Sequence, residues 1–219
     1  MITYDMIRKD EAIRTYITRA DESLIALGYT EHSFAHVTKV AEMGGYILET
    51  LGYPEKDIEL VKIAGFLHDI GNLINRVEHS QSGAVMAFRI LDKMGMEPEN
   101  IAAVVTAIGN HDEGTGTPVN AISAALFLAD KSDVRRTRDR NIKPTEFDIH
   151  DRVKYSVTSS KLAINEEKTE ISLTLTIDTQ YSSVMEYFEI FLERMLLCRK
   201  AADKLGLRFT LTINDQVLM

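Results

Sequence analysis

Residues 58–72 read IELVKIAGFLHDIGN, and this stretch decides how the chain folds. Apolar residues recur at helical spacing and lead directly into the adjacent pair His68-Asp69, and Gly71 marks the end of the helix. An ionisable pair at the end of a strongly apolar helix costs desolvation free energy unless something compensates for it. A divalent metal ion would do so, because an imidazole nitrogen and a carboxylate oxygen are both good ligands.

A second apolar helix ends in the same way. Residues 126–131 read LFLADK and bring Asp130 to the end of a hydrophobic segment. This carboxylate has the same desolvation problem and accepts the same solution. Each of the two helix ends is therefore a candidate for metal ligation.

Helical periodicity covers most of the first two thirds of the chain, and glycine or proline separates the segments. The pattern predicts six helices, over residues 4–27, 30–51, 54–68, 79–94, 98–110 and 121–130. The run Gly114–Pro118 is typical of a loop. We therefore expect a mainly α protein whose first part is a helical bundle.

The period changes from helical to two after about residue 150. Strands are expected over 153–164, 171–177 and 207–213, with a helix over 181–204 between the last two. This order, β-β-α-β, describes a small α+β unit. We expect a helical domain over 1–145 and the α+β unit over 146–219, packed on the bundle or on a second copy of the chain in a homodimer.

Composition excludes several classes of protein. The chain has 219 residues, a net charge of −8 and one cysteine, Cys198. A disulfide framework is therefore excluded, and an acidic chain is a poor partner for an extended nucleic acid. No signal peptide or membrane span is visible, so we expect a cytoplasmic protein without a membrane partner.

Four residues form a recognisable series along the chain. They are His36 in HVTKVA, the pair His68-Asp69, and Asp130 in ADK, spread over about residues 28–140. In order, helical context and separation, they resemble the HD superfamily of metal-dependent phosphohydrolases. The resemblance implies the HD-domain helical bundle as the fold and His36, His68, Asp69 and Asp130 as the ligands of one metal ion.

Two further histidines extend the resemblance to a second metal ion. His79 stands in HSQSGA and His111 in IGNHD. In family members with both histidines, the carboxylate of the His-Asp pair bridges two ions, which here implies Asp69 as the bridge. We expect divalent ions, with Fe, Mn, Zn, Mg, Co and Ni not distinguished by these ligands. Two ions activate water for phosphoryl transfer, so no nucleophilic side chain is required.

Residues 131–143 form a local positive island in an acidic chain, with Lys131 adjacent to the ligand Asp130. Lysine and arginine match phosphate oxygens, so this island predicts an anion site. We expect Asp69 and Lys131 to be catalytic. The expected substrate-binding residues are Asn72, Arg76, Lys131, Arg135 and Arg136. Further candidates near the site are Glu31, His32, Asp112 and Glu113, and His32 competes with His36 as a ligand.

Two positions depart from the commonest form of the family. Asn72 stands where many members have a lysine, and Asp112 where many two-metal members have another histidine. A neutral amide brings no charge to a substrate, so the departures weaken any transfer of a particular substrate. They leave the metal ligands unchanged.

These features together predict a metal-dependent phosphohydrolase that cleaves a small phosphate ester or nucleotide with metal-activated water. Two alternatives remain open at this point. Some HD-type proteins with six such ligands resemble myo-inositol oxygenase and use two irons to activate oxygen. A nucleotide-binding sensor without catalysis is the other alternative, and retention of six ligand positions argues against it.

Overall fold

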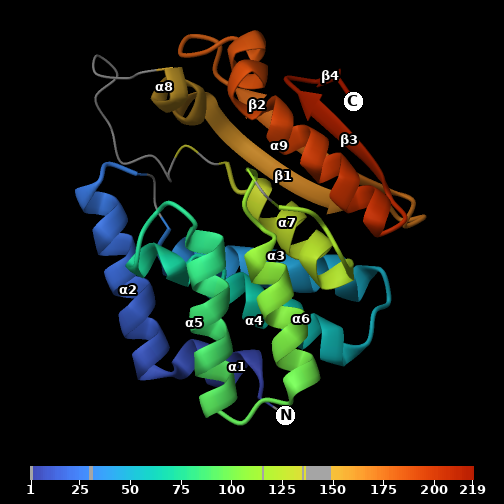
Figure 1. The fold of residues 1–219 in the computed structure, drawn as a ribbon. Helices are drawn as coiled ribbons and strands as arrows, with labels where there is room; N and C mark the ends of the chain where they lie inside the picture. The colour runs from blue at the N-terminus through green and yellow to red at the C-terminus, as the bar shows by residue number, and fades with distance from the viewer. Residues whose placement is uncertain (1, 30–31, 115, 135, 137–148) are drawn as a thin grey trace.

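The computed structural model describes residues 2–29, 32–114, 116–134, 136 and 149–219. Its first part is a helical bundle (Figure 1). The helices are α1 (Tyr4–Lys9), α2 (Glu11–Ala26), α3 (Phe34–Thr50), α4 (Glu55–Leu67), the short 3₁₀ helix η1 (Ile70–Leu73), α5 (His79–Lys93), α6 (Pro98–Gly109) and α7 (Ala121–Lys131). Every residue of α7 from Ile122 to Lys131 is buried, so this helix lies at the heart of the bundle.

The predicted first helix, 4–27, is wrong in one respect, because it is two helices. Asp10 ends α1 and also begins α2, where its side chain accepts a hydrogen bond from the backbone N–H of Ile13. An N-capping carboxylate of this kind favours a new helix start over continuation. The next helix begins at Phe34 behind the N-cap Ser33, later than the predicted residue 30.

The second part of the chain is an α+β unit, as expected. Its elements are α8 (Ile149–Ser156), β1 (Val157–Ile164), β2 (Glu170–Ile177), α9 (Val184–Lys204), β3 (Arg208–Ile213) and β4 (Gln216–Val217). The sheet order is β1-β2-β3-β4, with β2 and β3 parallel and the outer pairs antiparallel. The mainly helical class with a C-terminal α+β unit is therefore confirmed.

Two details of this unit differ from the prediction. Residues 149–156 form helix α8, whereas the sequence pattern extended the first strand back to residue 153. An ion pair of 2.9 Å between Arg152 and Glu186 of α9 accompanies this helix, and such a tertiary contact is invisible to local periodicity. The short strand β4 pairs with the end of β3 and was not predicted.

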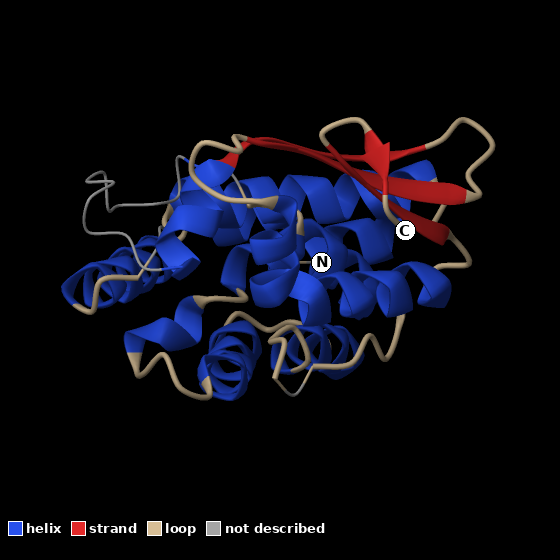
Figure 2. Ribbon diagram, turned by 90° about the horizontal axis from the view of Figure 1, so that it is seen from above, coloured by secondary structure: helices blue, strands red, loops and turns tan. Residues whose placement is uncertain are grey.

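The C-terminal unit is joined to the bundle through α9, which contacts both β3 and α7. Ile171, Leu173, Leu175 and Ile177 of β2 are buried, while the alternating Ser and Thr residues face outward. Figure 2 shows the sheet along one edge of the molecule, with the helices gathered on one side of it. The buried apolar residues of both parts form one continuous cluster, so α8 and α9 lie where they can contribute to a site in the bundle.

The predicted boundary between 145 and 146 falls outside the described residues and stays a prediction. Within the described part of the chain, no helix combines the length and hydrophobicity that crossing a bilayer requires.

Candidate metal centre and its cavity

The six predicted metal ligands meet inside the bundle, although they come from five separate regions of it. The contributing segments are α3, the turn between α4 and η1, the start of α5, the end of α6 and the end of α7. All six side chains are buried: His36, His68, Asp69, His79, His111 and Asp130. The centre of the cluster is the carboxylate of Asp69.

One oxygen of Asp69 faces the deepest part of the cluster. Its Oδ2 lies 3.1 Å from Nε2 of His68 and 3.6 Å from Nε2 of His36. Oδ1 of Asp130 completes this group, at 3.3 Å from His36 Nε2 and 3.7 Å from His68 Nε2. The competitor His32 is more distant, with its Nε2 at 3.9 Å from Asp69 Oδ2.

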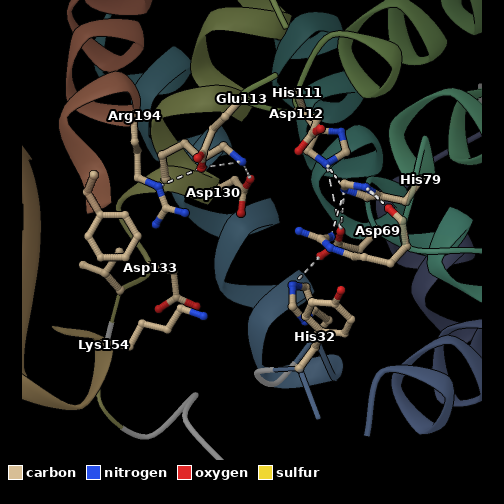
Figure 3. A pocket seen from close by; sticks show the side chains of 15 residues that line it. His32, Asp69, His79, His111, Asp112, Glu113, Asp130, Asp133, Lys154 and Arg194 are labelled. Atoms are coloured by element: carbon tan, nitrogen blue, oxygen red, sulfur yellow. Dashed lines mark hydrogen bonds and ion pairs between the residues drawn. The ribbon is translucent and has the colours of Figure 1, made fainter. Parts of the chain in front are cut away.

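The other oxygen of Asp69 faces a different pair of rings. Its Oδ1 lies 3.5 Å from Nε2 of His79 and 3.9 Å from Nε2 of His111. The two rings meet edge to face with centroids 5.0 Å apart. Asp69 therefore stands between two groups of side chains, with one oxygen toward each, and Figure 3 shows it with His79 and His111 of the second group.

Each of the four histidines of the cluster has a hydrogen-bond acceptor at its Nδ1 atom. The acceptors are Asp133 for His36 (2.8 Å) and backbone carbonyls for the others: Gly65 for His68 (2.7 Å), Arg76 for His79 (3.0 Å) and Ile108 for His111 (2.6 Å). An Nδ1–H donated outward leaves the Nε2 lone pair facing inward. The rings are thus oriented as metal ligands.

Several buried atoms here fit a cation better than they fit one another. Nε2 of His36 and Nε2 of His68 are buried without a hydrogen-bond partner. Nε2 of His79 lies 3.2 Å from Nε2 of His111, which brings two lone pairs together when both Nδ1 atoms are protonated. Ligand atoms of His36, His68 and Asp130 lie within 4.8 Å of one another, and so do those of His68, Asp69 and His111. The residues present therefore fit a bound metal.

The electrostatics of the cluster favour ionised carboxylates and two neutral histidines, whereas burial opposes the charge of His68 but Asp69 outweighs it and raises the pKa of His68 above 6.5. Burial opposes ionisation of Asp69 and Asp130, but the neighbouring His68 and Lys131 respectively outweigh it and hold both carboxyl pKa values well below 3.8. Burial holds the pKa of His111 well below 6.5 and also lowers that of His79. At neutral pH the cluster thus offers anionic carboxylates and neutral imidazoles from these two histidines.

Glycine allows the segments of the cluster to approach one another. A Cβ added at Gly71 would lie 2.0 Å from the backbone oxygen of His79 and 2.5 Å from the backbone nitrogen of Gly83. A Cβ at Gly65 would lie 2.8 Å from backbone atoms of Ala41 in α3. These two positions bring the His68-Asp69 turn against α5 and α4 against α3, which is why the ligands converge.

Asn72 and Arg76 lie beside the cluster, in different roles. The amide of Asn72 donates to Asp69 Oδ1 at 3.0 Å and to its backbone oxygen at 2.9 Å, so Asn72 holds the central carboxylate. It is not among the residues that line the cavity described below. Arg76 does line it, and its Nη1 donates to His79 Nε2 at 3.2 Å.

A cavity of about 220 Å³ opens beside the cluster (Figure 3). Its wall includes the cluster members Asp69, His79, His111 and Asp130, together with other residues of the bundle and three from the C-terminal unit. These other residues are Tyr29, His32, Arg76, Asp112, Glu113, Lys131, Asp133, Val134, Lys154, Phe191 and Arg194. Sequence reasoning missed Lys154, Phe191 and Arg194, because no local motif marks them and only the docking of α8 and α9 brings them here.

Lys131 lies in a chain of charges along this wall. Its ammonium is 2.8 Å from Asp130 Oδ2 and 3.4 Å from Glu113 Oε1. Nε of Arg194 donates to the same Glu113 oxygen at 2.7 Å. Burial opposes the charge of Lys131, but Asp130 and Glu113 raise its pKa above 10.5, so the side chain stays cationic.

The remaining predicted anion-binding residues fall elsewhere. Arg136 is not among the described residues that line the cavity. Its guanidinium lies over the rings of Tyr155 (4.4 Å) and Tyr181 (5.3 Å), and it donates to the Tyr155 backbone oxygen and to Asp178. Arg135 and the candidate Glu31 lie outside the described residues.

Asp133 is a functional candidate that the sequence did not single out. It is fully buried and holds His36 Nδ1 at 2.8 Å through one oxygen and Lys39 Nζ at 2.7 Å through the other. A carboxylate behind a ligand histidine fixes the ring and raises its basicity. In the sequence, Asp133 is marked only by its place three positions after Asp130.

Comparison with known proteins agrees with this description. The family model described as "HD domain" matches residues 33–153, more than half of the chain, and the protein belongs to this family. The family range contains all six residues of the cluster.

The particular relatives are distant. An uncharacterized protein of Methanocaldococcus jannaschii is 25% identical over 189 residues, covering 75% of this chain and 72% of that protein. Ribonuclease Y of Lawsonia intracellularis is 31% identical over 102 residues, covering 47% of this chain and only 18% of that protein. A crystal structure of a predicted HD superfamily hydrolase from an uncultured Thermotogales bacterium has 25% identity and a TM-score of 0.45, covering 62% of this chain and 75% of that one.

Proposed function

We propose that this protein is a metal-dependent phosphohydrolase that acts on a small phosphate ester or nucleotide and uses two divalent ions. One observation carries the proposal: the two oxygens of Asp69 face separate groups of inward-pointing imidazole nitrogens. His36, His68 and Asp130 would hold one ion and His79 and His111 the other, with Asp69 shared between them.

Two such ions would lower the pKa of water toward neutrality and offset charge on the phosphoryl oxygens. The chain's own residues supply the remaining functions. Asn72 keeps the Asp69 carboxylate oriented through its amide. Lys131, held cationic beside Asp130, places a positive charge at the cavity wall where a phosphate oxygen or leaving group would lie.

Arg76 is the best candidate for contact with the scissile phosphate on the side of His79. In the structure its Nη1 donates to Nε2 of His79, which is the atom that would coordinate a metal ion. Ligation of His79 would remove this acceptor and leave the guanidinium available for an anion. Arginine is suited to this role, because its planar fork matches two phosphate oxygens.

The charges of the cavity favour an anionic substrate only when the metals are bound. Five carboxylates line it, from Asp69, Asp112, Glu113, Asp130 and Asp133, against four cationic side chains, from Arg76, Lys131, Lys154 and Arg194. Divalent cations would make this balance positive. A volume near 220 Å³ is below the ~300–1,000 Å³ of pockets for drug-sized ligands, which favours a small substrate over a nucleic-acid strand.

The test is a hydrolysis screen of purified protein loaded in turn with each candidate metal. Phosphomonoesters, phosphodiesters and nucleotides are assayed for released phosphate or alcohol, with elemental analysis of the same samples. We expect metal-dependent hydrolysis of at least one class, abolished by chelator and by Asp69→Asn. The matched control is His150→Ala, which removes an exposed histidine outside the cluster.

The same screen distinguishes the alternatives. Each reaction is run with and without oxygen. Turnover that requires both iron and oxygen would replace the hydrolase by an oxygenase. Ligand binding that is identical in wild type and in the His68→Ala/Asp69→Ala variant, without hydrolysis of any class, would favour the sensor.

A further inference from the structure

Arg194 is one of two cationic residues that the C-terminal unit contributes to the wall of the cavity, with Lys154. It lies on α9, its side chain is only 19% exposed, and it lines the cavity with Phe191 and Lys154. Figure 3 shows its side chain reaching toward Glu113 from the helix on one side of the cavity, with His79 and His111 on the other. The side chain is therefore available to a molecule inside the cavity.

Most of the hydrogen-bonding capacity of Arg194 is unused. A guanidinium carries five N–H donors. Only Nε is engaged, by Glu113 at 2.7 Å, and Nη1 and Nη2 have no hydrogen-bond partner among the described residues. The ring of Phe191 covers one face of the group, with the Arg194 Cζ atom 4.3 Å from its centroid. The side chain is 19% exposed and lines the cavity, so its four remaining N–H donors can bond a ligand there.

Glu113 holds this guanidinium in place and connects it with the metal centre. The same Glu113 oxygen lies 3.4 Å from Lys131 Nζ, which in turn lies 2.8 Å from the ligand Asp130. Arg194 is thus fixed near the cluster while remaining separate from its ligands. This arrangement suits a group that binds a part of the substrate other than the reacting phosphate.

We propose that Arg194 forms a second anion subsite, which binds an additional carboxylate or phosphate of the substrate while its scissile phosphate lies at the metal cluster. This inference rests on the proposed function and deepens it, because it narrows the substrate class to small phosphate esters with a second anionic group. Lys154 of α8 lines the same end of the wall and adds positive charge there. The C-terminal unit thereby determines substrate specificity.

The test compares matched pairs of ligands by equilibrium binding to the metal-loaded protein. The probes are alkyl phosphates with and without a terminal carboxylate, with the alkyl chain lengthened one methylene at a time. At one chain length we expect the carboxylate to tighten binding by about tenfold or more, since hydrogen bonds to charged groups contribute roughly 1.5–3 kcal/mol. Arg194→Gln should abolish this gain and leave the affinity of the plain alkyl phosphate within about twofold.

Arg199→Gln is the matched control, because Arg199 is an exposed arginine on the same helix. It should retain the full carboxylate gain. If Arg194→Gln folds poorly because Glu113 is left without its partner, the double variant Glu113→Gln/Arg194→Gln removes both charges and provides the same measurement. Folding is checked by circular dichroism and thermal unfolding.

A carboxylate gain that persists in Arg194→Gln or in the double variant would overturn the subsite, as would the absence of any gain in wild type. These outcomes are separate from failure of the proposed function. If Arg194→Gln removes the gain in affinity from the carboxylate but the wild type hydrolyses no ester, the result would support the subsite and contradict the hydrolase.

Discussion

The two sides of Asp69 are unlike. On the Oδ2 side, His36 and His68 are fully buried and neither lines the cavity, and His36 is held from behind by the carboxylate of Asp133. On the Oδ1 side, His79 and His111 both border the cavity, and the acceptors at their Nδ1 atoms are backbone carbonyls. The histidines of the first group are therefore shut off from the cavity, although Asp130 of that group borders it, whereas the histidines of the second group lie where a substrate can reach them.

We expect two bound ions to differ in affinity and in access to the substrate. An ion on the Oδ2 side would be held more tightly, because carboxylate support strengthens a ligand histidine. An ion on the Oδ1 side would exchange more readily and meet the substrate first. The following variants test the difference between the two sides of Asp69.

Asp69→Asn should have the largest effect, because it changes the one carboxylate that faces both groups of histidines. We expect both ions to be lost and hydrolysis to fall by well over a hundredfold, since loss of a mere outer partner of a metal ligand costs about 10–100-fold. His111→Ala should leave one ion per chain. Elemental analysis after gel filtration measures this, and equal metal loss in the two variants would contradict the two-sided arrangement.

Asp133→Asn tests the outer support of the Oδ2 side alone. Its loss should weaken binding of the tighter ion by about 10–100-fold and leave the weaker ion unchanged. Competition with a metal chelator measures both affinities. Lys39→Gln is the control, because it removes a second side chain bound to Asp133 and leaves the acceptor of His36 in place. A comparable loss of affinity in Lys39→Gln would assign the effect to general destabilisation.

Glu113 gives the wall of the cavity a pH dependence. Burial opposes its ionisation, but Arg194 and Lys131 outweigh it and lower its pKa from 4.5. A depressed carboxyl pKa stabilises the folded state fully above the unfolded value of 4.5 and loses this contribution as pH falls through the folded pKa. Metal-free wild type should therefore exceed Glu113→Gln in unfolding free energy by about 2 kcal/mol at neutral pH.

Urea unfolding across a pH series measures this difference. The two proteins should converge as the pH falls below 4.5, where the carboxyl of the wild type becomes protonated. A gap that stays constant down to strongly acidic pH would show that the charge of Glu113 is not responsible.

Arg136→Ala should have the smallest effect on the reaction. Arg136 stacks on Tyr155 and Tyr181 and forms a partly exposed ion pair with Asp178. These contacts connect the chain after α7 with the C-terminal unit. We expect a loss of about 1–2 kcal/mol in unfolding free energy with substrate affinity changed less than about twofold. A large rise in KM with unchanged stability would restore Arg136 as a substrate-binding residue.

The sequence was most informative where one residue type interrupts a pattern. His68, Asp69 and Asp130 stand out because ionisable groups at the ends of apolar helices require a partner, and all three are buried in one cluster. Strand β2 could be predicted because apolar and polar residues alternate over 171–177, as they do in a strand with one buried face. Helix α8 was not predicted, and it packs against α9, a tertiary contact that local periodicity does not report.

The basic run after Asp130 shows the limit of such reasoning. Lys131 and Arg136 are close in sequence, yet one lies at the cavity and the other between two tyrosines. Sequence proximity to a ligand carries no information on which way a side chain points once the helix has ended. Arg194 also lines the cavity, although it lies more than sixty residues after Lys131 in the chain.

The sequence by itself determined the helical bundle and marked His68, Asp69 and Asp130, because hydrophobic periodicity and the cost of burying charge are local properties. The family resemblance added His36, His79 and His111 as candidate ligands. Only the tertiary structure decided which oxygen of Asp69 faces which histidines, which residues stand behind them, and that α9 closes the cavity. Those features depend on the relative position of elements distant in the chain, which close contacts at Gly65 and Gly71 and the docking of α9 on α7 establish.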